Sequence, residues 1–172
     1  FDHYKFIVHE LFIYTFSILL NYAQYKTAGE FLRSDFFIIK EVSLNELSHE
    51  KYCIFQQGIK SLEYRKKRLE LNRISLVADL FVQRAEGKKY NKTILDADLL
   101  LFYLQFIYYE ALNWYWFPST YIFSTYRKID ILQRLASKRF FNMVQPLFGI
   151  SSGQLKAKFF EFKNDYLIGY NN

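Results

Sequence analysis

Apolar side chains recur at helical spacing along most of the chain, and the most regular run lies between Cys53 and Glu86. This segment contains no proline and one glycine. Its apolar residues follow each other at intervals of three, four or seven, so they would share one side of a helix: Phe55, Ile59, Leu62, Leu69, Leu76 and Leu80. The pattern predicts one long central helix, or a collinear pair, over 53–86.

Several further stretches show the same period. Their starts often carry a Ser or Thr with an acid or amide three residues later, which satisfies free N–H groups at a helix start: Thr27, Ser43, Thr93 and Ser151. Residues 35–39 are β-branched and aromatic without a period, so they form either a buried extended connector or a lone strand. We therefore predict helices over 2–25, 27–34, 94–116, 130–145 and from Ser151 onward, with a short helix opened by Ser43.

Glycine and proline mark the expected helix ends. Gly87 follows the central segment as a left-handed stop, so residues 88–92 are predicted to form a basic loop. Pro118 and Pro146 end the helices before them, because the residue preceding a proline is pushed out of the α region. The fold predicted for residues 1–172 is all-α, a single compact domain of about seven helices.

The composition is that of a folded protein with an unusual share of aromatic residues. Hydrophobic residues make up 51% of the chain and charged residues 23%, which argues against disorder. Aromatic residues make up 21%, which reflects either A/T-rich codon usage or a surface of stacking platforms. The chain begins with Phe1 and its one methionine is Met143, so we expect a mature product or a piece of a longer protein.

The net charge of +6 is unevenly distributed. Residues 63–92 hold nine Lys or Arg against four acids, and residues 127–139 hold five against one. Either patch suits a phosphate-rich partner or an acidic protein surface. The candidate anion- or nucleic-acid-binding residues are cations of the first patch: Arg65, Lys66, Lys67, Arg68, Arg73, Lys88 and Lys89.

Residues 65–68 are four consecutive cations, which a helix spreads over about 300°. Lys66 falls on the apolar line, so it should meet protein or a bound anion while the other three face solvent. The group is either a solvated stretch of helix with Glu63 and Glu70 as local partners, or a binding surface.

Arg73 and Asp79 lie within an otherwise apolar stretch and are predicted to be partly buried structural polar residues. Their spacing of six places them on different faces of a helix, so each should find a partner on another helix. Arg73 is also where a bound anion is expected.

Four consecutive aromatic residues precede Pro118: Trp114, Tyr115, Trp116 and Phe117. A helix end cannot turn all four inward. The sequence therefore predicts an aromatic interaction surface between 114 and 126, used for self-association or for docking a partner domain.

The common catalytic and phosphate-binding motifs are missing from the sequence, including G-x-x-x-x-G-K-[ST], G-x-G-x-x-G, H-E-x-x-H, G-x-S-x-G and C-x-x-C. Glu46 and His49 stand as Glu-x-x-His, but a di-iron site needs a second such pair, and no other histidine provides one. Asp96 and Asp98 would diverge on a helix and suit its N-terminus electrostatically. We expect no catalytic residue, metal or cofactor.

The single cysteine, Cys53, cannot form an internal disulfide and is interpreted as a buried structural thiol, which fits a reducing, cytoplasmic setting. Residues 94–116 are the best candidate for a membrane span, but Glu110, Asn113 and Pro118 limit it. We interpret this stretch as a core helix and do not expect membrane association.

Three stretches resemble the helical C-terminal module of certain bacterial defence proteins whose N-terminal part is a TIR-like domain: residues 69–80 (LELNRISLVADL), 96–102 (DADLLLF) and 137–141 (SKRFF). They occur in the order that this module has. The resemblance implies that this chain is a non-catalytic half, and it transfers no catalytic residue.

The first hypothesis for the function is a non-catalytic interaction, oligomerisation or regulatory module that holds another protein domain or a second copy. The alternative is a nucleic-acid or nucleotide sensor that uses the basic patches, with Tyr64, Tyr90 and Tyr126 as stacking surfaces. An unrecognised enzyme and a membrane-associated bundle are the remaining alternatives.

Overall fold

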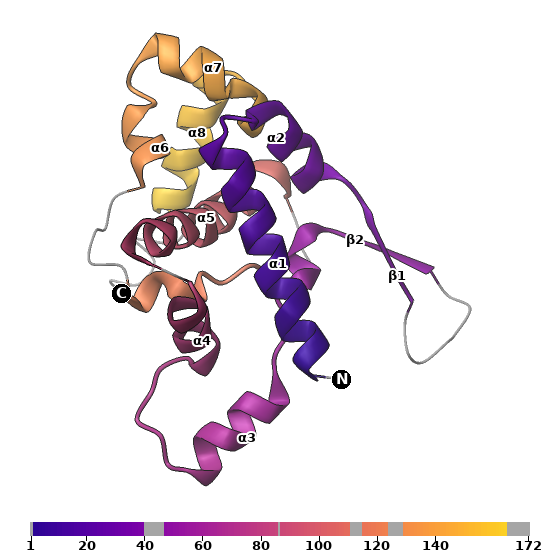
Figure 1. Cartoon of the computed structure of the whole chain (residues 1–172). Helices are drawn as coiled ribbons and strands as arrows, with labels where there is room; N and C mark the ends of the chain where they lie inside the picture. Colours follow the sequence, from indigo (N-terminus) through magenta and orange to yellow (C-terminus); the bar gives the residue numbers. More distant parts are fainter. Residues whose placement is uncertain (1, 40–46, 86, 111–114, 124–128, 165–172) are drawn as a thin grey trace.

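The computed structural model describes residues 2–39, 47–85, 87–110, 115–123 and 129–164, apart from the side chains of residues 39, 47 and 87–91. Eight α-helices fill most of this described part (Figure 1): α1 (Asp2–Asn21), α2 (Tyr25–Arg33), α3 (Lys60–Arg68), α4 (Leu76–Arg84), α5 (Gly87–Tyr108), α6 (Asp130–Arg134), α7 (Lys138–Phe148) and α8 (Ser152–Phe162). Two 3₁₀-helices and two strands complete it: η1 (Tyr52–Phe55), η2 (Ser119–Phe123), β1 (Phe36–Ile39) and β2 (Leu47–Glu50). The predicted all-α fold is confirmed.

The central element is α5, which packs against α1, α7, α8 and η2. Its side chains are apolar on several sides, and Leu100, Leu101 and Leu104 are fully buried. One hydrophobic cluster extends from α1 through α5 to α8. Among the described residues, no helix is long and apolar enough to cross a membrane.

The segment over 53–86 is not the long helix that its pattern predicts. It is divided into η1, α3 and α4, and residues 69–75 between α3 and α4 are not helical. Glu70 has a left-handed backbone (φ 47°), which ends α3, and the Ser75 side chain accepts from the N–H of Ala78 to begin α4. The line breaks because α3 buries no residue, so no packing energy supports a continuous helix.

Other helix ends also differ from those predicted. Helix α2 begins at Tyr25, before the Thr27 capping box, and Gly87 begins α5 instead of ending its predecessor. The helix predicted over 130–145 is two helices, and Pro146 lies inside the second, which Gly149 ends with φ 70°. The predicted capping box at Ser151 and Gln154 is confirmed at the start of α8.

Strands β1 and β2 pair antiparallel, with Phe36 opposite Glu50 and Phe37 opposite His49. Residues 36–39 are therefore a strand, but it pairs with β2 and is not the lone strand that the sequence analysis offered as one alternative. The short helix predicted after Ser43 falls partly on residues 43–46, which lie outside the described part, and from Leu47 the chain is a strand. His49 is therefore not in the helix that a Glu-x-x-His metal motif requires.

Candidate anion-binding arm

Helix α3 and the following residues 69–75 form an arm that stands away from the other helices at the bottom of Figure 1. We refer to residues 60–75 as the basic arm. Helix α3 carries five cations and one acid and buries none of its residues. Its main packing contact is with α4. A helix with this composition cannot be held by a core, so its cations are free to meet solvent or a ligand.

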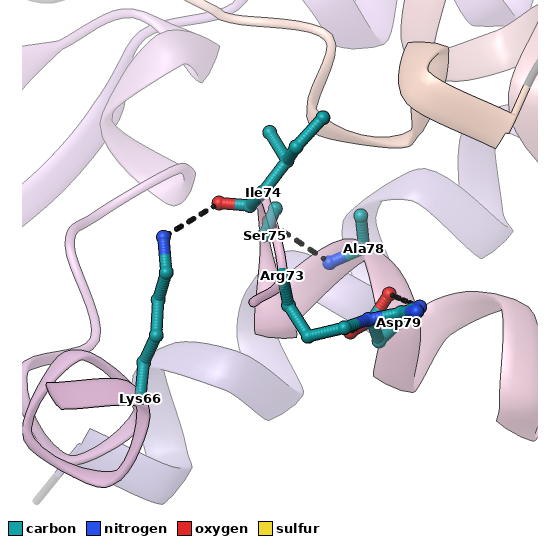
Figure 2. Close-up of polar contacts among 6 residues, drawn as sticks. All are labelled: Lys66, Arg73, Ile74, Ser75, Ala78 and Asp79. Carbon is teal, nitrogen blue, oxygen red and sulfur yellow. Dashed lines mark hydrogen bonds and ion pairs between the residues drawn. The ribbon is translucent and has the colours of Figure 1, made fainter. Parts of the chain in front are cut away.

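Polar contacts fix both ends of the arm. At its start, the carboxylate of Asp2 on α1 accepts from the N–H of Ser61 at 2.6 Å, and this hydrogen bond lowers the pKa of Asp2. At its end, Lys66 Nζ donates to the carbonyl oxygen of Ile74 at 3.2 Å (Figure 2). Lys66 thereby ties α3 to the segment that leads into α4.

Arg73 and Asp79 pair with each other, as Figure 2 shows. Arg73 Nε donates to Asp79 Oδ2 at 2.7 Å and Arg73 Nη2 donates to Oδ1 at 2.5 Å, and these bonds raise the pKa of Arg73. The prediction that each finds a partner on another helix is wrong. Arg73 lies in the non-helical segment before α4, so helical spacing does not separate the two side chains.

The bidentate pair also changes the assignment of Arg73 as an anion site. Its charge is matched by Asp79, whose side chain is 20% exposed while that of Arg73 is 52% exposed. An anion would have to compete with a carboxylate already bound in the preferred geometry. Arg73 is therefore a structural residue of the arm, and the anion-binding assignment passes to the cations of α3.

The cations of residues 65–68 divide as predicted. Lys66 is half-buried and bonded to protein, whereas Arg65, Lys67 and Arg68 are exposed. None of these three forms an ion pair with another residue in the described ranges, and the expected local partners Glu63 and Glu70 do not pair with them there. The positive charge of α3 is thus largely uncompensated.

An open hollow of about 710 Å³ lies along the arm. Its lining combines three lysines with two glutamates, an exposed tyrosine and a leucine: Lys60, Glu63, Tyr64, Lys66, Lys67, Glu70 and Leu71. Tyr64 is 73% exposed, so its ring is available to stack on a planar ligand. Lysine ammonium groups beside an exposed ring are suited to a phosphate backbone with unpaired bases.

The other predicted cations within the described helices lie on α5, α6 and α7. Lys88 and Lys89 lie in the first turn of α5, where the side chains are outside the described part. Of the second basic patch, Arg134 pairs with Asp130 and lies over the Phe140 ring at 4.0 Å, while Lys138 and Arg139 are exposed. Lys92 of the first patch and Arg134 of the second line one hollow, which shares no lining residue with the hollow along the arm. The two predicted patches therefore meet in the described part, but not at α3.

The predicted aromatic surface is only partly present. Trp116 is fully buried, which corrects its assignment, whereas Tyr115 and Phe117 are 56% and 70% exposed. Trp114 lies outside the described residues. Exposed and buried residues alternate from Tyr115 to Pro118, so the core takes Trp116 and its two neighbours stay outside.

Sequence reasoning missed the buried polar network that holds Trp116. Asp98 is fully buried and accepts from Trp116 Nε1, the Thr120 N–H and the Thr120 hydroxyl. The Gln105 amide accepts from the Trp116 N–H at 2.6 Å and donates to its carbonyl at 2.9 Å. The signal was available, because Asp98 and Gln105 interrupt the most apolar helix of the chain.

Burial has the largest effect on the pKa values of the titratable groups in this network. It raises the pKa of Asp98 to about 6, although its three hydrogen bonds favour the charged form. It also raises the pKa of the Cys53 thiol, which lies 3.6 Å from Gln105 Oε1, to about 11. A thiol that stays protonated near neutral pH is a poor nucleophile, in line with a structural role. Within the described ranges, no three metal-ligating side chains gather in one place.

Comparison with known proteins adds no relative from which a function could be transferred. No protein-family model, curated protein or solved structure matches the chain.

Proposed function

We propose that the chain is a non-catalytic helical module that acts by binding, and that its basic arm contacts the phosphate backbone of a nucleic acid. One observation carries the proposal: Arg65, Lys67 and Arg68 project from a helix without buried residues and form no ion pair with any residue of the described part. Uncompensated cations of this kind gain free energy by releasing the counterions of a polyphosphate.

The shape of α3 supports a nucleic acid over a flat protein surface. Its cations leave the helix in different directions, about 100° apart per residue, so they can reach phosphates on both sides of a groove. An α-helix is about 10–12 Å across, which matches the width of about 12 Å of the DNA major groove. The cores of protein interfaces contain few Lys, Glu and Asp residues, whereas most residues of α3 are charged.

The structure weakens one support for the protein-docking hypothesis, because Trp116 is buried. Tyr115 and Phe117 still favour docking to a partner domain as the second candidate function. The resemblance to a module that follows a TIR-like domain would make that partner the catalytic half of a defence protein. Both functions leave the catalysis to another domain.

The test is a salt titration of binding to a fluorescein-labelled DNA duplex and to a single-stranded RNA, followed by fluorescence anisotropy. A variant with Arg65, Lys67 and Arg68 replaced by Ala should bind more weakly, and its slope of log K against log salt should fall by up to about three. The matched control replaces three exposed cations outside the arm by Ala and lowers the net charge equally: Lys26, Lys156 and Lys163.

The two triple variants separate local binding from overall charge. Loss of affinity in the arm variant alone supports the arm as the binding element. Equal losses in both variants show that only the net charge of +6 attracts the polyanion. If the parent protein shows no salt-dependent binding, the nucleic-acid proposal is contradicted. Pull-down by a separately expressed TIR-like domain would then favour the second candidate.

A further inference from the structure

Helix α1 exposes a continuous apolar face. Six large apolar residues of this helix and its C-terminal end are between 42% and 74% exposed: Tyr4, Ile7, Val8, Leu11, Ile18 and Tyr22. Thr15 is exposed between them. Of the three charged residues of α1, Glu10 is buried and Asp2 and Lys5 are half-buried. We refer to the six exposed apolar positions and Thr15 together as the outer face of α1.

The outer face is a helical stripe. Its positions follow each other at intervals of one, three or four, and the opposite side of α1 buries Phe12, Ile13, Phe16 and Leu20 in the core. The helix packs against α2, α5 and η1, and no described element lies in front of it in Figure 1. The helix is thus apolar on the side it buries and on the side it leaves open.

The size of this face is at the upper limit for a monomer. A tyrosine side chain offers about 200 Å², so the seven partly exposed side chains together present roughly 600 Å² of mainly apolar surface. The largest apolar patch of a typical monomer is about 300–600 Å² and often marks an interaction site. We therefore expect another molecule to bind to the outer face.

We infer that the occupant is a second copy of this chain, whose α1 lies antiparallel across a two-fold axis. A two-fold interface needs one surface that is complementary to itself, with residue i opposite j and j opposite i. The outer face meets this condition when the numbers of facing residues add to 26, which pairs Tyr4 with Tyr22, Val8 with Ile18 and Leu11 with Thr15.

The flanks of the stripe also keep like charges apart. In a two-fold pair equivalent flanks meet, so Lys5 lies on the flank that carries Leu19 of the other copy, and the two Lys5 residues are about 24 Å apart along the helix axis. With no exposed charge among its seven positions, the face brings no like charges together at its centre. The antiparallel arrangement therefore pairs Tyr4 with Tyr22 and Val8 with Ile18, places Leu11 beside the uncharged Thr15, and brings no like charges together.

The area sets the expected strength of association. Two copies would bury on the order of 1,200 Å², the lower end of the range for stable interfaces. We therefore expect a reversible dimer with a dissociation constant in the micromolar range. Added salt should strengthen the dimer or leave it unchanged, because each copy carries a net charge of +6 that opposes association. This dependence is opposite to that of polyanion binding, so the dimer does not rest on the proposed function.

Sedimentation velocity up to about 200 μM tests self-association. Leu11→Glu should weaken the dimer at least tenfold, because two-fold symmetry brings the two carboxylates within about 6 Å along the helix axis. The matched control is Phe160→Glu, which changes an equally exposed apolar residue on α8 and should leave the dimer intact. Mixing Leu11→Glu with Leu11→Lys should restore a heterodimer, which also shows that both variants are folded.

Cross-linking tests the register. Tyr4→Cys and Tyr22→Cys mixed together should react with a short bismaleimide to give a covalent dimer, whereas either variant alone should not, because identical positions lie about 27 Å apart. The parent protein serves as the control for the buried Cys53. A monomer at all concentrations, a dimer unaffected by Leu11→Glu, or cross-linking of Tyr4→Cys with itself would overturn the proposal.

Discussion

Asp98 holds Trp116 in the core: Trp116 Nε1 donates to Asp98 Oδ1 at 2.7 Å, and both side chains are fully buried. The second carboxylate oxygen accepts from the N–H and the hydroxyl of Thr120. One acid of α5 thus fastens the connector that follows the helix at two points. Gln56 holds the next residue, because it accepts from the N–H of Phe117 and donates to its carbonyl oxygen.

Asp98 should make the folded state less stable as pH rises. Its pKa is about 6 when folded and about 3.8 when unfolded, so the native state holds the proton over this window. The stabilisation is complete below about pH 3.8 and is lost as pH passes 6, with a total change of about 3 kcal/mol. Urea unfolding of Asp98→Asn and the parent protein from pH 4 to 7.5 measures it, and two parallel curves would contradict the prediction.

His9 should act in the opposite sense. Its ring lies between Phe81 and Trp116 with Nε2 unbonded, and burial lowers its pKa from 6.5 to about 3. The unfolded chain therefore binds a proton that the native state does not bind, and the stability of the folded state falls as pH decreases below 6.5. His9→Leu should gain about 2 kcal/mol relative to the parent protein between pH 7.5 and pH 5. A pH-independent difference between the two proteins would refute this assignment.

Arg84 should stabilise the fold by neutralising Glu10. The Glu10 side chain is 5% exposed, and its Oε1 accepts from Arg84 Nε at 2.7 Å and from the Tyr14 hydroxyl at 3.1 Å. Arg84→Ala would leave a buried carboxylate without its counter-ion, so we expect a loss of about 2–3 kcal/mol.

The exposed pair of Lys26 and Glu30, 4.0 Å apart, provides the control. Lys26→Ala should change stability by less than about 0.5 kcal/mol. If denaturant unfolding shows similar losses for both variants, the Glu10 carboxylate is solvated and its pairing with Arg84 does not matter.

Gly29 should resist any side chain, because α2 meets α7 there. A Cβ at this position would lie 2.5 Å from the carbonyl oxygen of Pro146, a backbone atom that cannot move alone. The same carbonyl accepts from Arg33, which also bonds the Leu147 carbonyl and lies over the Tyr108 ring. Gly29→Ala should therefore cost about 2 kcal/mol or more.

Gly153 on α8 offers the matched control, since a Cβ there meets nothing within 4 Å. Gly153→Ala should raise stability by up to about 1 kcal/mol through helix propensity. Thermal unfolding of the two variants should shift the midpoint in opposite directions, and a neutral Gly29→Ala would show that α2 and α7 can separate.

Local sequence patterns predicted the helical class and some helix starts, but not those at Thr27 or Gly87. Helical periodicity predicted the all-α fold, and the Ser151 capping box formed as expected because its hydrogen bonds lie within four residues. Helix geometry also predicted that Lys66 contacts protein while Arg65, Lys67 and Arg68 are exposed, because consecutive residues of a helix point in different directions.

What each apolar side of a helix contacts depends on the tertiary structure. Periodicity shows which residues share a side of a helix, but not whether another element covers that side. The apolar line over 53–86 broke at residues 69–75 because nothing packs on α3, and one break let Arg73 reach Asp79. Trp116 is buried because Asp98 and Gln105 on α5 satisfy its polar groups. The outer face of α1 stays exposed because no described element packs over it. These outcomes depend on contacts between distant residues, which no local pattern encodes.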